Sequence, residues 1–471
     1  MNKITLLVFA WLSVLPVYGQ EFSPLKTFSE RSSQKWKAIS QRTELEIAKI
    51  NSPEKNQIAK VLEERLKFLE REFNSKNYLD DSVLQNRVDQ VWARLISANT
   101  LANKPGQILI SNSSNVNAFS FGEGTVIVNV GFLARIRNES QLAFALAHEL
   151  AHYQLNHTLI NIARKAEGAE DKEVQAALAK FKSGNVSYHD YSVIVSWMFT
   201  TTGFQRKQEI AADSLGFLLY AKAGYREDQA GELLKILDSA QSAKYHPGMA
   251  LFNPLNFASF PFRQSWIKES KTHVVKDTLR ETFLDSVRSH PHVRERLNHL
   301  LQISNTHQGK TYQTDSSRFQ HAVIRAEYQC IQSSFENNRF DKSLFFALQL
   351  KQQYPPNKYA VTMIGRILLS LNIQRRNTTA HRFVPGSSQW YRSDLKAVIN
   401  FLNNIDLRDL GEITFRFINL KGNFDAHNEE HYFILWKVCL FTDRWETAGK
   451  VRVMYRSKFP RGEYVEDMMT Q

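Results

Sequence analysis

Cysteine is scarce in this chain of 471 residues, which contains only Cys330 and Cys439. Neither lies at the spacing that zinc-binding cysteine motifs use, so a cysteine-based metal site is not expected. In an exported protein the two cysteines could form a disulfide bond in the C-terminal region. Two buried free thiols fit the sequence almost equally well, and both alternatives stay open.

Long apolar runs are also missing after the N-terminus, and none is long enough to cross a bilayer. Residues 1–19 have the pattern of a secretory signal peptide: Lys3, an apolar stretch from Ile4 to Leu15, and small residues at Val17 and Gly19. As an uncleaved anchor this stretch would be short for a membrane span. No cysteine follows it to carry a lipid, so we predict an exported protein without a lipid anchor.

A nucleic-acid-binding motif is absent as well. The net charge of +13 arises from 60 Lys and Arg against 47 Asp and Glu, and it is spread along the chain. Such a balance is compatible with nucleic acid, an anionic membrane surface or acidic partners. Because no motif supports the first of these, we expect no nucleic-acid partner and interpret the charge as a surface property suited to an anionic cell envelope.

The most informative stretch is His148-Glu149-Leu150-Ala151-His152, within an apolar run from Leu142 to Leu159. Asn138 and Gln141 precede it like an N-cap and its partner, which predicts a buried helix. Histidines four residues apart lie on one face of a helix and can bind one zinc ion. Glu149 is turned by about 100° from His148, beside the metal, where a general base for water is needed.

The alternative is a core helix whose histidines are satisfied by hydrogen bonds. Against it, two imidazoles and a carboxylate within an apolar helix are costly to bury unless something binds them. The pattern therefore favours the zinc interpretation.

A second helical stretch is predicted to open at Gln208 and contains Glu209 and Asp213, four residues apart. A carboxylate from another helix is what two helical histidines need to complete a three-ligand zinc site. Asp213 could then accept the ring N–H of a ligand histidine and fix its tautomer. Taken alone, Glu209 would be a solvent-facing acid, and His290 would be structural or exposed.

The remaining pattern is mainly helical, with one small sheet. Apolar spacing predicts packing helices from Ser52 and from about Asp80. The β-rich runs Gln107–Ser111, Asn117–Phe121 and Thr125–Val130 predict three short strands, the last two forming a hairpin.

Two later regions have a less specific pattern. The stretch Gly248–Phe262, rich in Phe, Pro and Asn, is expected to be a loop that either lines a substrate cleft or covers core. From about residue 310 the pattern is purely helical. Asn338–Pro355 and Asp443–Pro460 each resemble the second helix of a tetratricopeptide unit with its closing proline, and a generic helical bundle fits equally well.

Together these fragments resemble the M48 family of zinc metallopeptidases over roughly residues 75–305. The order and spacing of the fragments carry the resemblance, since each alone is ambiguous. They are Val116-Asn117-Ala118-Phe119, Gly131-Phe132-Leu133, His148 to His152, Arg206 to Asp213, and His290-Pro291 through Arg296.

The resemblance implies a role for particular residues. His148, His152 and Glu209 would be the zinc ligands and Glu149 the catalytic base, with Asp213 supporting a ligand. His290 matches a family histidine near the metal, and Arg296 matches an arginine that we expect to be structural. The strand Asn117-Ala118-Phe119 would be the edge on which an extended peptide substrate lies.

We therefore predict a mainly α (α+β) protein. Its parts are a signal peptide (1–19), a helical segment (20–74), a helical zincin-type metallopeptidase domain with a small β-sheet (75–305) and an all-α, repeat-like C-terminal domain (310–471). An exported M48 domain followed by helical repeats resembles the periplasmic members that handle envelope proteins. This implies one zinc ion per chain, unfolded or misassembled envelope proteins as substrates, and C-terminal helices that dock substrates or a membrane-protein assembly machine.

Two other functions fit parts of the sequence. One is a periplasmic chaperone or binding protein in which proteolysis is secondary, although the intact motif argues against an inactive enzyme. The other is a purely structural zinc site. Structural sites usually have four protein ligands and favour cysteine, whereas this sequence offers three candidates and no nearby cysteine.

Overall fold

The structure is a computed structural model of the whole chain, and its description covers the following residues: 22–27, 30–51, 55–74, 77–120, 123–170, scattered positions in 172–180, 188–241, 249–269, 293–304, 312, 316–386 and 393–469. The predicted signal peptide (1–19), the helix start at Ser52 and His290 lie outside the described residues.

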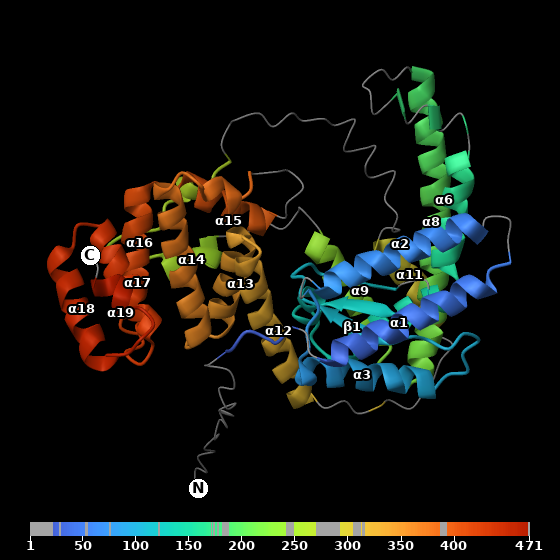
Figure 1. Cartoon of the computed structure of the whole chain (residues 1–471), viewed down its shortest axis with the longest axis horizontal. Coiled ribbons are helices and arrows are strands. Elements are labelled where there is room, and N and C mark those ends of the chain that lie inside the picture. The colour runs from blue at the N-terminus through green and yellow to red at the C-terminus, as the bar shows by residue number, and fades with distance from the viewer. Residues whose placement is uncertain are drawn as a thin grey trace, which may run out of the picture.

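The elements gather in two halves (Figure 1). The first half combines the sheet with helices α1 to α11, and the second is helical throughout. This confirms the predicted fold class, mainly helical with one small sheet. The helices of the first half are α1 (Glu30–Lys49), α2 (Lys55–Asn74), α3 (Ser82–Ser97), α4 (Val130–Leu133), α5 (Glu139–Gln154), α6 (His157–Glu170), α8 (Tyr188–Lys222), α9 (Asp228–Gln241) and α11 (Val293–Ser304).

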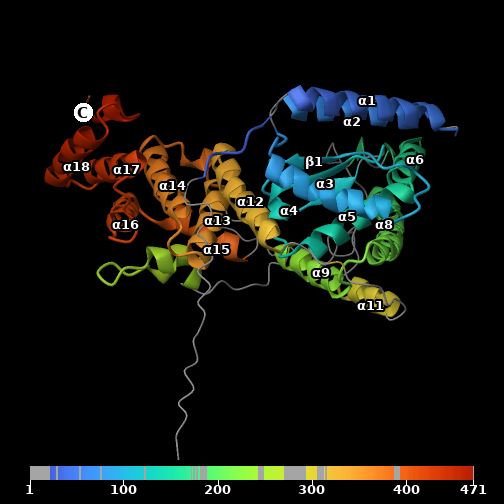
Figure 2. The ribbon, with the colours of Figure 1, turned by 90° about the horizontal axis from the view of Figure 1, so that it is seen from below.

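The sheet has three strands, β1 (Ile108–Ser111), β2 (Ala118–Ser120) and β3 (Val126–Asn129), in the order β1-β3-β2. β1 runs parallel to β3, and β2 pairs with β3 as the predicted antiparallel hairpin, with Ala118 opposite Val128. Alternate side chains point to opposite faces. One face packs in the core with α3 and α5, and the other packs against α1 and α2. Figure 2 shows the sheet between these layers.

Helix α5 carries the His-Glu-x-x-His sequence. Its N-cap is Asn138, as predicted, and the Asn138 side chain accepts a hydrogen bond of 3.0 Å from the backbone N–H of Gln141. The prediction of one helix from Leu142 to Leu159 was wrong. α5 ends at Gln154, Asn156 takes a left-handed φ of 54°, and α6 begins at His157. Asparagine tolerates this conformation better than most residues, which allows the chain to turn there.

Helix α8 is longer than expected. We predicted that a helix opens at Gln208, but α8 runs without interruption from Tyr188 to Lys222. The apolar and aromatic residues 191–200, which precede Gln208 in the sequence, therefore belong to the same helix. A single glycine, Gly203, lies between the two stretches, and one glycine without a proline is too weak a signal to end a helix.

A glycine sets how closely α8 packs on α5. A Cβ atom at Gly216 would lie 2.9 Å from the Cα atom of His148 and 3.0 Å from its backbone nitrogen. No side chain fits in that space, so only glycine allows α8 to lie directly against the backbone of the first histidine.

The C-terminal half is an array of packed helices and short 3-10 helices. Its elements are α12 (Ser316–Glu336), α13 (Phe340–Gln353), α14 (Lys358–Arg376), η3 (Ala380–Arg382), α15 (Ser393–Asn404), α16 (Leu407–Asn419), α17 (Glu429–Phe441), α18 (Trp445–Lys458) and α19 (Val465–Met469). Cys330 and Cys439 are both buried free thiols within it, which decides that open question.

Residues 249–267, which include most of the Phe-rich stretch predicted as a loop, cover this C-terminal core. They form two 3-10 helices, η1 (Met249–Leu255) and η2 (Gln264–Ile267). Phe252 stacks on Phe262 with ring centroids 4.5 Å apart, and Phe262 lies 5.2 Å from Phe401. Of the two alternatives for this stretch, covering core is therefore confirmed. This segment precedes the predicted domain boundary between residues 305 and 310, yet it packs with the second half. The position of the boundary therefore stays a prediction.

No helix in the described part of the chain combines the length and apolarity needed to span a membrane.

The close approach at Gly216 generates a prediction. Gly216→Ala should lower the free energy of unfolding by about 1–3 kcal/mol, because the new methyl group must push α8 away from α5. It should also weaken zinc binding, since Glu209 is on α8. Urea denaturation and zinc titration measure the two effects.

Gly449→Ala is the matched control, because a Cβ atom at that position in α18 meets nothing within 4 Å. There the substitution should leave stability unchanged or raise it by about 0.5–1 kcal/mol. Equal effects of the two substitutions would contradict the packing argument.

Candidate active site

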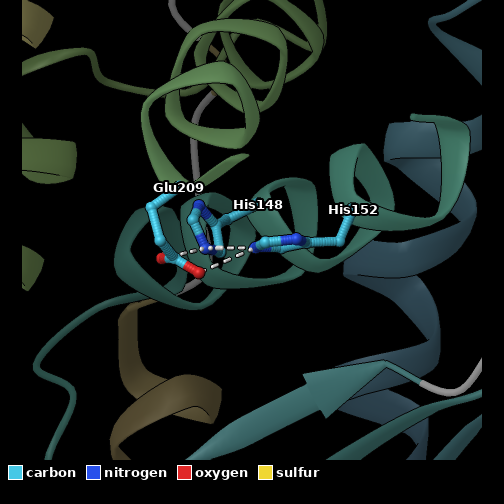
Figure 3. Close-up of side chains that lie close together, drawn as sticks. All are labelled: His148, His152 and Glu209. Atoms are coloured by element: carbon cyan, nitrogen blue, oxygen red, sulfur yellow. Dashed lines mark hydrogen bonds and ion pairs between the residues drawn. The ribbon is translucent and has the colours of Figure 1, made fainter. Parts of the chain in front are cut away.

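Three predicted ligand residues converge in the first half. His148 and His152 project from one side of α5, and Glu209 reaches them from α8 (Figure 3). The Nε2 atoms of the two histidines are 3.1 Å apart. Oε2 of Glu209 lies 3.5 Å from Nε2 of His148, and Oε1 lies 3.4 Å from Nε2 of His152. Residues 57 and 61 positions apart in the sequence thus share one site.

These distances suit a zinc ion. Zinc ligands in proteins lie about 2.0–2.1 Å from the metal in a tetrahedral arrangement, which places any two ligand atoms about 3.3 Å apart. The three measured distances are close to that value. Among the described residues, His148, His152 and Glu209 are the one group of three or more histidine, cysteine or acidic side chains whose ligand atoms all lie within 4.8 Å of one another.

Asp213 and Arg296 support the first histidine. Oδ1 of Asp213 lies 3.0 Å from Nδ1 of His148, as predicted for a residue that fixes the tautomer. Arg296, on α11, donates two hydrogen bonds of 2.7 Å to the same carboxylate. Burial alone would raise the pKa of Asp213, but hydrogen bonds from Arg296 and His148 hold it below its usual range. Asp213 therefore stays ionised and leaves Nε2 of His148 facing the site.

The electrostatics of the site favour a cation. Burial opposes protonation of His148, yet hydrogen bonds and charge interactions with Asp213 and Glu209 raise its pKa to about 10. Burial and the neighbouring His148 lower the pKa of His152 to about 3. The carboxylates of Asp213 and Glu209 thus favour positive charge at the histidine pair, and a zinc ion can supply it.

Glu149 lies beside the ligands, next to strand β2. Its carboxylate interacts with Ser120 of that strand, and burial raises its pKa to about 7. A carboxylate with a pKa near neutrality can accept a proton and return it, as a general base must.

The predicted substrate edge is the outer strand of the sheet. Ala118 and Phe119 lie in β2, and the carbonyl oxygen of Asn117 accepts a hydrogen bond of 3.1 Å from the N–H of Asn129 in β3. β3 covers one side of β2, and among the described residues no strand pairs with the other side. This strand also packs on α5.

His157 also contacts the site, although no pattern in the sequence predicted it. It is the first residue of α6, it is buried, and its Nδ1 atom lies 3.0 Å from Nδ1 of His152. The five-residue spacing from His152 gave no signal, because it matches neither a continuous helix face nor a familiar zinc motif. Only the turn at Asn156 brings the two rings together.

Comparison with known proteins identifies the domain that holds this site. Residues 82–304 match the sequence model of peptidase family M48. These residues, just under half of the chain, are therefore similar to the M48 peptidases. The match confirms the resemblance and the predicted class of metallopeptidase. It includes α5, α8 and α11 but neither the α1–α2 hairpin nor the C-terminal helices.

Individual relatives are similar over part of the chain. The chain is 25% identical over 189 residues to the beta-barrel assembly-enhancing protease of Escherichia coli, covering 38% of this chain and 37% of the relative. It is 29% identical over 147 residues to the mitochondrial metalloendopeptidase OMA1 of Arabidopsis thaliana, covering 31% and 29%. The chain thus matches less than half the length of each relative.

The buried ion pair of the M48 domain can be tested by removing its cation. Arg296→Met should lower the free energy of unfolding by about 3–5 kcal/mol, because the buried Asp213 carboxylate loses its guanidinium partner. Denaturant unfolding of the metal-free protein measures this loss.

Arg226→Met is the matched control. Arg226 donates two hydrogen bonds to Asp228 with the same fork geometry, but that pair is exposed to solvent. Exposed pairs contribute little to stability, so this variant should unfold almost like the wild type. A similar loss in both variants would show that burial is not the cause.

Proposed function

We propose that this protein is an exported zinc-dependent endopeptidase that cleaves unfolded or misassembled envelope proteins. The observation that carries the proposal is the convergence of His148, His152 and Glu209 beside the carboxylate of Glu149. The match of residues 82–304 to the model of peptidase family M48 supports the same chemistry.

Each residue has a distinct role in this proposal. His148, His152 and Glu209 hold the zinc ion, and Asp213 keeps the ring of His148 oriented toward it. Zinc bound there supplies Lewis acidity, which polarises the scissile carbonyl and makes water more acidic. Glu149 accepts a proton from the attacking water and delivers it to the nitrogen of the leaving amine, so the peptide bond breaks as one water is consumed.

The open side of β2 would orient the substrate. An extended peptide can add to a sheet edge through backbone hydrogen bonds, with the side chains of Asn117, Ala118 and Phe119 next to it. β2 packs on the helix that carries Glu149, so a peptide on this edge would lie beside the catalytic base. Backbone pairing requires an extended segment, which favours unfolded or loop-exposed substrates over compact ones.

Three observations support an envelope role. The first 19 residues have a signal-peptide pattern, which makes the periplasm the proposed location. The net charge of +13 suits an anionic surface. The E. coli relative is named for enhancing beta-barrel assembly. We therefore propose that the C-terminal helices dock substrates or a membrane-protein assembly machine onto the protease.

Removal of the general base tests the chemistry. Glu149→Gln should lower kcat by at least about 10²–10⁴-fold, because no carboxylate remains to transfer the proton. Zinc content should stay near one per chain, since Glu149 is not a ligand. Cleavage of an unfolded protein and metal analysis measure both, and loss of zinc together with activity would contradict this role.

The pH dependence follows from the same residue. Only ionised Glu149 can accept a proton, so kcat/KM should fall as pH falls through the pKa of Glu149. That pKa is raised to about 7 in the metal-free site, and a bound cation lowers it, which places the acid limb at or below pH 7. The limb should be absent from the residual activity of Glu149→Gln.

The chaperone alternative predicts a different outcome. If proteolysis is secondary, Glu149→Gln should still prevent aggregation of an unfolded client and rescue cells that lack the protein. If proteolysis is the main function, the variant should bind clients without rescuing the cells.

Backbone methylation of a peptide substrate tests the β2 edge. N-methylation of an amide that pairs with β2 should raise KM by about 2- to 10-fold, because one hydrogen bond is lost. Methylation at alternate positions, whose N–H groups point away from the sheet, should have little effect. The same KM at every position would exclude strand pairing.

A further inference from the structure

His157 is neither a candidate zinc ligand nor the candidate general base, yet its ring contacts the ligand histidine His152. Its side chain is 6% exposed, and its Nδ1 atom faces Nδ1 of His152 at 3.0 Å. The opposite nitrogen of His152, Nε2, faces His148 and Glu209. His152 therefore lies between the metal cluster on one side and His157 on the other.

The tautomer of His152 depends on this contact. A neutral imidazole that offers the lone pair of Nε2 to a metal carries its proton on Nδ1. That N–H must find an acceptor, since a buried donor without one is costly. The atom within hydrogen-bond distance is Nδ1 of His157, which can accept when its own proton is on Nε2.

The fold holds His157 in this position. Asn156, with its φ of 54°, turns the chain between the end of α5 at Gln154 and the start of α6 at His157. Farther along α6, Ile162 is buried with Ile58 and Leu62 of α2. The α1–α2 hairpin that supports α6 lies outside the residues that match the M48 family model.

His157 is not placed as a fourth ligand. Its contact is with the nitrogen of His152 that points away from Glu209, and the cluster of ligand atoms within 4.8 Å contains His148, His152 and Glu209 without it. Its position corresponds to that of Asp213, which contacts Nδ1 of the other histidine.

We propose that His157 is a positioning residue for the zinc site, which accepts the Nδ1–H of His152 and thereby fixes the tautomer and ring orientation that present Nε2 to the metal. The inference rests on the proposed function, because it requires that the cluster bind zinc. Each ligand histidine would then have its own partner, an ionised carboxylate for His148 and a neutral imidazole for His152.

Two substitutions separate the hydrogen bond from the space that the ring fills. His157→Leu fills the space without an acceptor. In His157→Asn the amide oxygen takes the place of Nδ1 and can still accept the proton. We expect His157→Leu to weaken zinc affinity by about 10–100-fold in competition with a chelator, and His157→Asn to stay within a few-fold of the wild type.

Activity gives a second readout. At saturating zinc, His157→Leu should recover most of its activity with an unchanged KM, because the peptide-binding edge is intact. A general structural defect would not be corrected by added zinc. Thermal unfolding of the metal-free variants checks that both fold. If His157→Leu does not fold, His157→Gln replaces it, since its amide oxygen is one methylene farther out and no longer coincides with Nδ1.

The outcomes distinguish this inference from the proposed function. A wild-type protein without zinc would contradict the proposed function itself. Wild-type binding near one zinc per chain, with equal affinity in all His157 variants, would overturn the role of His157 alone. Equal weakening by His157→Leu and His157→Asn would also overturn it, because the acceptor would then be irrelevant.

Discussion

Buried negative charge is the constraint on which the centre of this protein depends. The carboxylates of Glu209 and Asp213 both approach the imidazole of His148 inside the domain, and Arg296 compensates only Asp213 directly. Buried charges are costly unless they are paired or bind a metal. A cation between the two histidines and Glu209 removes this cost, and the same two carboxylates raise the pKa of His148.

The surrounding fold brings these groups together and holds them. α8 must lie against the backbone of α5 for Glu209 to reach the histidines, and Gly216 provides the space. α11 contributes Arg296, and the turn at Asn156 returns His157 to His152. Each ligand histidine is thus contacted on both ring nitrogens. Because both rings are held in fixed orientations, the ligand atoms are pre-organised. Less rearrangement of side chains is then needed when a metal binds.

The two halves of the chain are connected by more than a linker. Residues 22–27 lie between them: Phe22 packs against Tyr328 with ring centroids 5.2 Å apart, while the carbonyl oxygen of Lys26 accepts a hydrogen bond of 2.8 Å from the N–H of Asp80. The 3-10 segments η1 and η2, which lie between α9 and α11 in sequence, bury their aromatic rings in the C-terminal core.

The sequence by itself determined the local chemistry: the helix that places His148, Glu149 and His152, its cap at Asn138, the β2–β3 hairpin and the all-helical C-terminal half. These depend on short-range periodicity and capping, which neighbouring residues decide. It also suggested Glu209, Asp213 and Arg296, but through their order along the chain and a family resemblance. Only the tertiary structure decided that α8 approaches α5 at Gly216, that the aromatic stretch covers the second half, and that His157 contacts His152. These features depend on packing between distant segments and on the left-handed backbone conformation of Asn156. Neither leaves a periodic pattern in the sequence.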